Sequence, residues 1–215
     1  MANSLFADGD LAPAEQIVRD YLAQDEGNVG ALRLLARICM ERGALAEAQV
    51  RLERAVHLAP DYDDARFDLA AALLQQQKHE QARVQTGDLL TREPANRDYL
   101  KQHCAACIAQ GDHEPVIDLC AKLLASPALA AAEIADLQMW RANALKVTGR
   151  QREAVMSYYA SLAARPDHGV AWFSLANLKA YRFTDDEIAR MRAAAEARPD
   201  AQEMDRIYLC FALGW

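Results

Sequence analysis

The side chains best placed for chemistry in this sequence are three cysteines and a histidine. Cys104 and Cys107 are separated by two alanines, His103 precedes them, and Cys120 falls in the next expected helix. Thiolates and an imidazole at such spacing can hold zinc, and paired cysteines can carry out redox chemistry. The simpler interpretation is that Cys104 and Cys107 face a helical core, because no strand precedes them as a thioredoxin-like site requires. We therefore predict no metal here, and these four residues are the only plausible ligands.

No other group of side chains converges on a reaction centre. The nine glycines stand apart from one another, so the chain has neither a phosphate-binding loop nor a dinucleotide-binding fingerprint. Four histidines fall at expected helix ends or turns, where a solvated or capping role is the ordinary one. They are His57, His79, His113 and His168. We predict no catalytic residue and no cofactor, so the chain as it stands is expected not to be an enzyme.

The composition is that of a folded, helix-rich chain with an acidic surface. Of 215 residues, 52% are hydrophobic and 26% charged, and 31 acidic against 24 basic side chains give a net charge of −7. Such a charge disfavours binding to nucleic acid or to an anionic bilayer. No apolar stretch approaches the roughly 18 residues of a membrane helix, and no signal peptide is visible. Five cysteines, an odd number, favour reduced thiols, so we predict a cytoplasmic protein without membrane insertion.

A step of 34 residues organises the chain. It relates three alanines, two prolines and several glycines, which are Ala14, Ala48 and Ala82, Pro60 and Pro94, and Gly9, Gly43 and Gly111. Glycine permits a left-handed turn between two helices, and proline stops the second helix. Alanine lets two helices approach closely where they cross. This pattern predicts an all-α, right-handed solenoid of antiparallel helix pairs with about 11–12 helices.

The register divides the chain into seven segments. They are 1–28, an incomplete repeat with an almost absent first helix; 29–62; 63–96; 97–134, with a four-residue insertion; 135–168; 169–200, a divergent repeat; and 201–215, the first helix of an unfinished repeat. First helices should begin near Val29, Asp63, Arg97, Ala135 and Gly169. The partner helices should follow turns near Gly43, Gln77, Gly111, Gly149 and Phe183.

These residues resemble the tetratricopeptide repeat (TPR) over essentially the whole chain. The resemblance implies a concave groove lined by the first helices, in which a protein or peptide can lie. The residues expected to line this groove are Arg33, Arg37, Phe67, Lys101, Met139, Asn143, Lys146, Phe173, Asn177 and Tyr181, with Met40, Leu74, Ile108 and Ala180 beside them. The alternative is that Phe67, Met139 and Phe173 pack between neighbouring repeats.

One known mode of peptide capture is disfavoured. TPR proteins that bind chaperones hold a C-terminal carboxylate with amide and basic side chains at fixed positions. At the corresponding positions this chain has Asp64, Asp68, Asp98 and Gln102. Capture of a C-terminal carboxylate by that route is therefore not expected.

Three later stretches resemble a narrower family. Residues 140–163, 169–191 and 205–214 are similar to the repeat region of bacterial TPR-containing sulfotransferases. The matching string is Ser174, Leu175, Ala176, Asn177, Leu178, Lys179, Tyr181, Arg182 and Phe183. The resemblance implies a catalytic α/β domain that uses 3′-phosphoadenosine 5′-phosphosulfate (PAPS), which would lie beyond residue 215.

The C-terminal part departs from the repeat pattern. Residues 184–187 read as a capping box that opens a helix with Ile188, Met191 and Ala195 on one face and a stop at Pro199. The last segment, 202–215, is apolar almost all round, and Gly214 looks like the small crossing residue of a further first helix. We expect this segment either to be continued by further chain in a longer protein or to be covered by another subunit.

Two classes of function stay open on these grounds. The first is a noncatalytic protein-binding scaffold, the repeat portion of a sulfotransferase-like protein. The second is a protein that homology would assign to the PAPS-dependent sulfotransferases although this segment lacks the chemistry. A free-standing adaptor in secretion or assembly is a further alternative.

Overall fold

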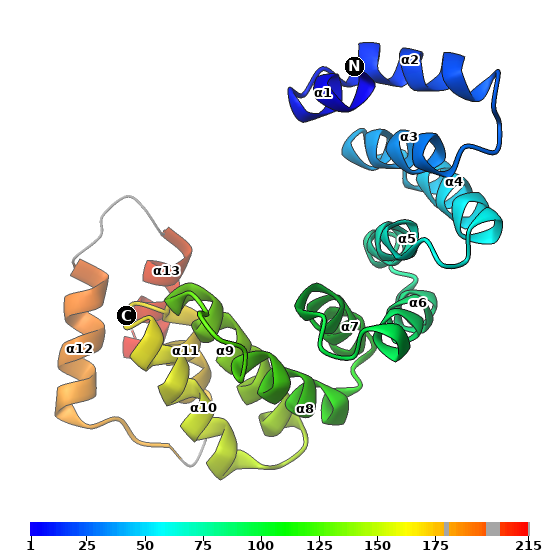
Figure 1. Cartoon of the computed structure of the whole chain (residues 1–215). Coiled ribbons are helices and arrows are strands. Elements are labelled where there is room, and N and C mark those ends of the chain that lie inside the picture. Colours follow the sequence, from blue (N-terminus) through cyan, green and yellow to red (C-terminus); the bar gives the residue numbers. More distant parts are fainter. Residues whose placement is uncertain (179–180, 197–202, 215) are drawn as a thin grey trace. The chain divides into compact units, whose positions relative to one another are not determined.

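Every regular element among the described residues is a helix. The computed structural model describes residues 1–178, 181–196 and 203–214. Its helices are α1 (Ala2–Ala7), α2 (Leu11–Leu22), α3 (Val29–Glu41), α4 (Leu45–Leu58), α5 (Asp63–Gln75), α6 (His79–Arg92), α7 (Arg97–Gln110), α8 (His113–Leu124), α9 (Ala131–Val147), α10 (Gln151–Ala164), α11 (Gly169–Ala176), α12 (Asp185–Glu196) and α13 (Glu203–Leu213) (Figure 1). The all-α class is confirmed. The described helices number thirteen instead of 11–12, and one of them is the short helix α1 where the sequence indicated an almost absent one.

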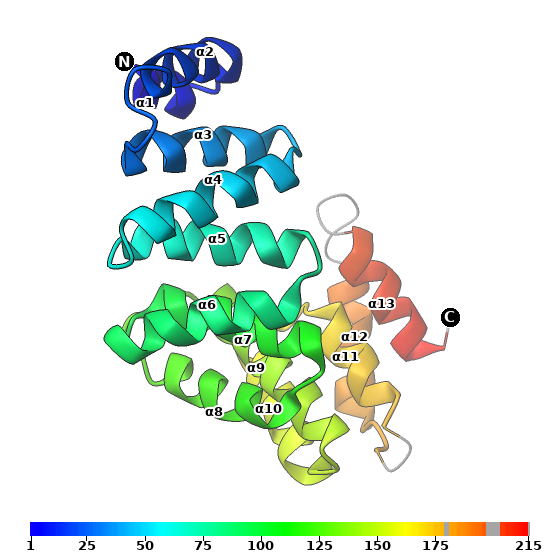
Figure 2. The same ribbon diagram turned by 90° about the vertical axis from the view of Figure 1, so that its right-hand side faces the viewer.

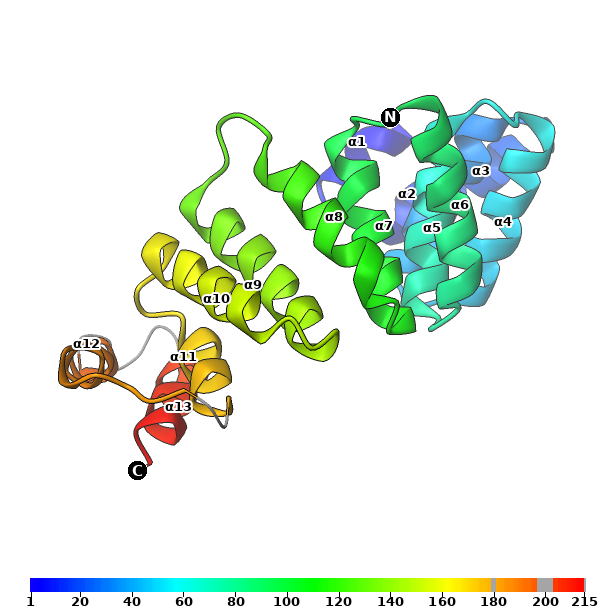
Figure 3. The same ribbon diagram turned by 90° about the horizontal axis from the view of Figure 1, so that it is seen from below.

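The helices form two compact units, residues 1–111 (unit 1) and 112–215 (unit 2). In unit 1, α3 packs on α4, α4 on α5, and α5 on α6, so that pairs follow one another in sequence order (Figure 2). In unit 2, α9 and α10 form an antiparallel pair that is plain in Figure 3. The boundary falls inside the predicted repeat 97–134, so α7 and α8 belong to different units.

The turns inside the pairs lie where the register predicts them. Gly9, Gly43, Gly111 and Gly149 all have positive φ angles between 74° and 85°. Gln77, which stands where the pattern expects glycine, adopts the same conformation with φ 61°. A side chain with a Cβ is strained in this region, which is why the other turns use glycine.

The crossing alanines are completely buried. Ala14, Ala48, Ala82 and Ala154 each have 0% exposure on the second helices α2, α4, α6 and α10. The core of unit 1 surrounds the first three with larger side chains, among them Val18, Leu32, Leu35, Ile38, Leu52, Leu69 and Leu73. A methyl group at the crossing allows the close backbone approach that the repeat requires.

The four-residue insertion lengthens a helix. The sequence analysis expected a first helix to begin near Ala135, and this was wrong, because α9 begins at Ala131. With 17 residues, α9 is longer than α7, which has 14. The extra residues form about one further turn at its N-terminus instead of a loop. Ala128 in the preceding connection has a positive φ of 58°.

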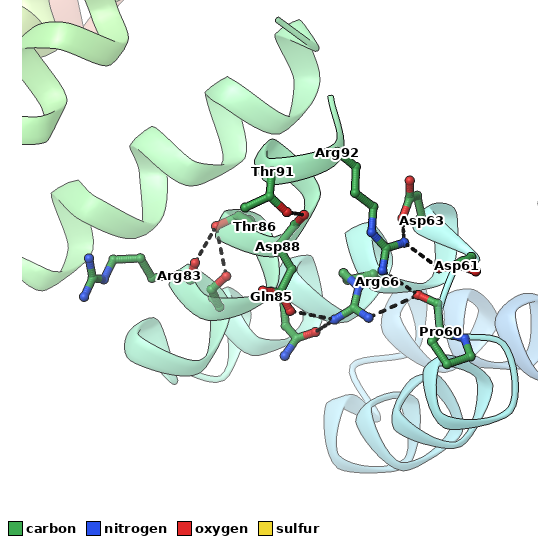
Figure 4. Close-up of polar contacts among 11 residues, drawn as sticks. Pro60, Asp61, Asp63, Arg66, Arg83, Gln85, Thr86, Asp88, Thr91 and Arg92 are labelled. Atoms are coloured by element: carbon green, nitrogen blue, oxygen red, sulfur yellow. Dashed lines mark hydrogen bonds and ion pairs between the residues drawn. The ribbon is translucent and has the colours of Figure 1, made fainter. Parts of the chain in front are cut away.

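The connection between α4 and α5 is held by two arginines. Arg66 of α5 and Arg92 of α6 both donate hydrogen bonds to the carbonyl oxygen of Pro60, at 3.2 and 3.0 Å (Figure 4). Arg66 also pairs with Asp88 at 3.0 Å, and Arg92 pairs with Asp63 at 2.5 Å. α4 stops before Pro60, as predicted, and both helices of the next pair fix the chain there.

The sixth pair is irregular, as the sequence indicated. α11 has only 8 residues, and α12 opens with the predicted capping box. The Thr184 N–H donates to Glu187 Oε2 at 2.7 Å, and the Glu187 N–H donates to Thr184 Oγ1 at 3.3 Å. Met191 and Ala195 of α12 are buried. The predicted stop at Pro199 lies outside the described residues.

Gly214 does not lie inside a helix. The sequence analysis placed it at a helix crossing, but it follows the end of α13 with φ 75°, the conformation of the turn glycines. Leu209 of α13 is buried, whereas Met204 and Phe211 are 61% and 60% exposed. One side of α13 thus packs within unit 2 and the other side is open.

Candidate interaction surface

Arg33 of α3 anchors the surface that the first helices offer in unit 1. Its Nε donates to Asp68 Oδ2 at 2.6 Å, one of its terminal nitrogens donates to Tyr62 at 3.3 Å, and the same group pairs with Asp64. Burial opposes its charge, but the hydrogen bonds to Asp68 and Tyr62 and the attraction of the two carboxylates raise the pKa of Arg33 above its ordinary value. The residues that replace a carboxylate clamp, Asp64 and Asp68, therefore neutralise a neighbouring arginine.

A pocket of about 460 Å³ opens beside Arg33. It is lined by Ala2, Asn3, Ile17, Val18, Tyr21, Asn28, Gly30, Ala31, Arg33, Leu34, Arg37 and Tyr62, which come from α1, α2, α3 and the start of α5. Arg37 stacks over the ring of Phe6 at 4.7 Å. The pocket therefore has an apolar floor and a rim with cationic, amide and phenolic groups.

The other predicted groove residues of unit 1 divide between packing and exposure. The ring of Phe67 lies 5.6 Å from that of Tyr99, across two neighbouring first helices. Lys101 is half-buried on α7. Gln102 donates to the carbonyl oxygen of Phe67 at 2.9 Å, so it too holds neighbouring first helices together.

In unit 2, three of the predicted groove residues make internal contacts. Met139 is 6% exposed. Asn143 accepts a hydrogen bond at 2.8 Å from Tyr158, whose pKa burial raises to about 12. Phe173 stacks on Tyr208 of α13, with 5.4 Å between ring centroids.

The three remaining groove residues of unit 2 differ in exposure. Lys146 is half-buried and Asn177 is exposed. Tyr181 donates to Glu187 at 2.6 Å, and Glu187 also accepts from Tyr159. Ala180 lies outside the described residues.

The cysteine cluster is part of the core. Cys104, Cys107 and Cys120 have 0% exposure. The Nδ1 atom of His103 lies 2.7 Å from Thr86 Oγ1, and burial, followed by the charge of Arg83, lowers its pKa. Within the described ranges, no three His, Cys, Asp or Glu side chains are grouped as metal ligands.

His168 differs from its predicted role. It occupies the position before α11, but its side chain is 5% exposed and neither solvated nor capping. Its Nδ1 lies 2.9 Å from Ser161 Oγ, and Ser161 donates its one proton to the carbonyl oxygen of Ala135 at 2.9 Å. Nδ1 must then be the donor, and burial lowers the pKa of His168. This pair is a buried structural link between helices.

Sequence reasoning missed several residues of the pocket. Ile17, Tyr21, Asn28 and Gly30 line it but were not expected there. The 34-residue step could have found Tyr21, because its equivalents Ala55 and Leu89 are fully buried whereas Tyr21 is 49% exposed. Only an incomplete pair leaves that position open.

Comparison with known proteins agrees with this architecture. Residues 5–57 and 40–107 match the family model described as "Tetratricopeptide repeat". This segment consists of tetratricopeptide repeats. The matched repeats lie in unit 1 and include every element that lines the pocket. No curated protein matches the chain in sequence.

Solved TPR structures share the fold over most of the chain. A crystal structure of MamA has a TM-score of 0.69 at 19% identity and covers 77% of this chain and 95% of its own. YrrB, described as a TPR protein with an unusual peptide-binding site, has a TM-score of 0.72 at 15% identity and covers 80% and 87%. MamA from Desulfovibrio magneticus RS-1, residues 41 to the end, has a TM-score of 0.68 at 13% identity and covers 77% and 91%. At these identities the likeness establishes the fold.

None of the described helices is long and apolar enough to cross a bilayer.

Proposed function

We propose that this chain is a noncatalytic scaffold that binds a protein or peptide on the surface of its first helices. The observation that carries the proposal is the pocket of about 460 Å³ that includes Arg33 and Arg37, two of the residues expected in the groove. A pocket with an apolar floor and a few polar groups on its rim suits a short peptide segment. The description of YrrB as a protein with a peptide-binding site supports the proposal.

The binding surface is proposed to extend over the exposed and half-exposed groove residues. Arg37 and Asn177 are exposed, and Lys101 and Lys146 are half-buried. Phe67, Met139 and Phe173 instead stiffen the surface from within, because each packs against neighbouring side chains or is buried. The open side of α13, with Met204 and Phe211, is proposed to be covered by further chain or by another subunit.

Selection of peptides from a displayed random library against the purified chain tests this function. The selected peptides, made synthetically, should protect first-helix amides from hydrogen exchange, and Arg37→Ala or Lys101→Ala should weaken their binding. Val50→Ser is the matched control, because Val50 is 61% exposed on the second helix α4. Protection confined to second helices, or equal binding by all these variants, would contradict the proposal.

A second candidate is a bacterial, cytoplasmic protein whose repeats belong to a TPR-sulfotransferase. It is favoured by the string from Ser174 to Phe183 and by the stretch 140–163. In this candidate the repeats position a partner or an acceptor for a catalytic domain outside the chain. We expect the 215 residues to show no affinity for PAPS in calorimetry. Measurable affinity would place nucleotide chemistry in the repeats themselves.

A further inference from the structure

The first helix of unit 1 is about two turns shorter than its successors. α1 has 6 residues, whereas α3 and α5 have 13 each. All three end two residues before a turn residue with positive φ, which is Gly9, Gly43 or Gln77. The difference of seven residues, about 10 Å of helix, therefore lies entirely at the N-terminal end of α1.

The pocket beside Arg33 lies at that end. Ala2 and Asn3 of α1 line it, Ile17 and Tyr21 of α2 contribute to its floor, and α3 adds Gly30, Ala31 and Leu34. The pocket therefore lies where the missing turns of a complete first helix would run along α2.

Burial at equivalent positions supports this geometry. Tyr21 is 49% exposed, while Ala55, Leu89 and Leu123, one, two and three steps of 34 residues further on, are all 0% exposed. Complete helix pairs cover this position of the second helix, and the first pair leaves it open. Ala31 of α3 is likewise half-buried, whereas its equivalent Ala65 is fully buried.

The rim of the pocket carries an uncompensated positive charge. Arg33 is neutralised by Asp64 and Asp68. Arg37, one turn further along α3, stacks on Phe6, and no carboxylate of the described residues is paired with it. An occupant that places a carboxylate near Arg37 would gain a charge-assisted hydrogen bond.

We propose that the pocket receives a short amphipathic helix of a partner protein, which completes the first repeat in trans. Its apolar stripe lies on Ile17, Tyr21 and Leu34, and an acidic side chain meets Arg37. The small residues Gly30 and Ala31 allow the close approach that a helix needs. This inference rests on the proposed function and deepens it, because it names the class of partner and the end of the surface that it uses.

A stapled synthetic helix of about 14 residues is a suitable probe. It carries leucine and alanine on one face and one glutamate beside that face, and a twin carries lysine in place of the glutamate. Fluorescence anisotropy with the full chain should show the glutamate helix binding at least about tenfold more tightly than its twin. Arg37→Glu should reverse that preference.

Two further variants sharpen the test. Gly30→Leu should abolish binding by filling the pocket, and the fold tolerates it, since a Cβ at Gly30 meets only Asn28 Oδ1 at 3.5 Å and the backbone has ordinary φ. Arg83→Glu is the charge-matched control, because Arg83 is an exposed arginine of unit 1 that does not line the pocket. It should bind both helices as the unchanged chain does.

Several outcomes would overturn the inference. No binding of either helix, or equal binding of both by the chain and by Arg37→Glu, removes the pocket as a helix site. Self-association that Gly30→Leu abolishes in sedimentation would make a second copy the occupant. If library-selected peptides still bind first-helix residues in Gly30→Leu, this inference fails while the proposed function stands.

Discussion

Gly169 and Asp205 hold α11 and α13 at a separation that no other residue type at position 169 permits. A Cβ at Gly169 would lie 2.1 Å from the carbonyl oxygen of Asp205. The Gly169 N–H donates to Asp205 Oδ1 at 3.0 Å, and Arg165 donates to both oxygens of the same carboxylate. Asp205 thus caps the N-terminus of α11 from another helix, where the helix dipole favours a negative charge.

Replacing Gly169 with alanine should detach α13 from α11. The obstacle is backbone, which cannot rotate away, so we expect a loss of about 3 kcal/mol of unfolding free energy. Urea unfolding measures it. Gly87→Ala is the matched control, because a Cβ there meets only His103 Cε1 at 4.0 Å. That variant should leave stability unchanged or raise it by up to about 1 kcal/mol. Equal effects of the two substitutions would refute the close approach.

The carboxylate of Asp205 should contribute separately from the packing. Asp205→Asn keeps the shape but removes the charge that faces Arg165 and the N-terminus of α11. We expect a loss of about 1 to 2 kcal/mol in urea unfolding, within the range of a lost cap and a charge-assisted hydrogen bond. Asp61→Asn, at a carboxylate with a fully exposed side chain, should change stability by less than about 0.5 kcal/mol.

Gln77→Gly should stabilise unit 1. Gln77 has a φ of 61° at a turn where the neighbouring repeats use glycine. Removal of the Cβ relieves the left-handed strain, although glycine adds entropy to the unfolded chain, so the expected gain is about 0.5 to 1 kcal/mol. Thermal unfolding measures this gain. Gln75→Gly, in the last turn of α5, should destabilise instead, and a lower melting temperature for Gln77→Gly would contradict the strain.

Ala48→Leu should lower the melting temperature. Ala48 is fully buried at a helix crossing, and overpacking of such a site costs about 1 to 3 kcal/mol. Val50→Leu on the same helix should have little effect, because Val50 is exposed. An unchanged melting curve for Ala48→Leu would count against the crossing.

Stability should fall between about pH 7.5 and about pH 5.5 through His168. Burial, then the charge of Arg165, lowers the pKa of His168 in the folded chain. The unfolded chain therefore binds the proton first as pH falls through about 6.5, which favours unfolding. His168→Gln should show a smaller loss of unfolding free energy over this range in urea titrations. An identical loss would mean that other groups, such as His103, account for it.

The sequence by itself determined the helix pairs and their turns. Gly43, Gly149 and the buried Ala48 and Ala82 act through local conformation and residue size, which a period of 34 residues makes visible. Gln77 was placed in its turn by register alone, although its residue type argues against that conformation.

Only the tertiary structure decided which distant side chains meet. Asp205 caps α11 across 36 residues, and the missing turns of α1 expose Tyr21, whose residue type carries no sign of it. The insertion before Ala135 became helix instead of loop. Such outcomes depend on how whole helices pack, because the free energy of a contact between distant residues is set by geometry that neither residue's local sequence contains.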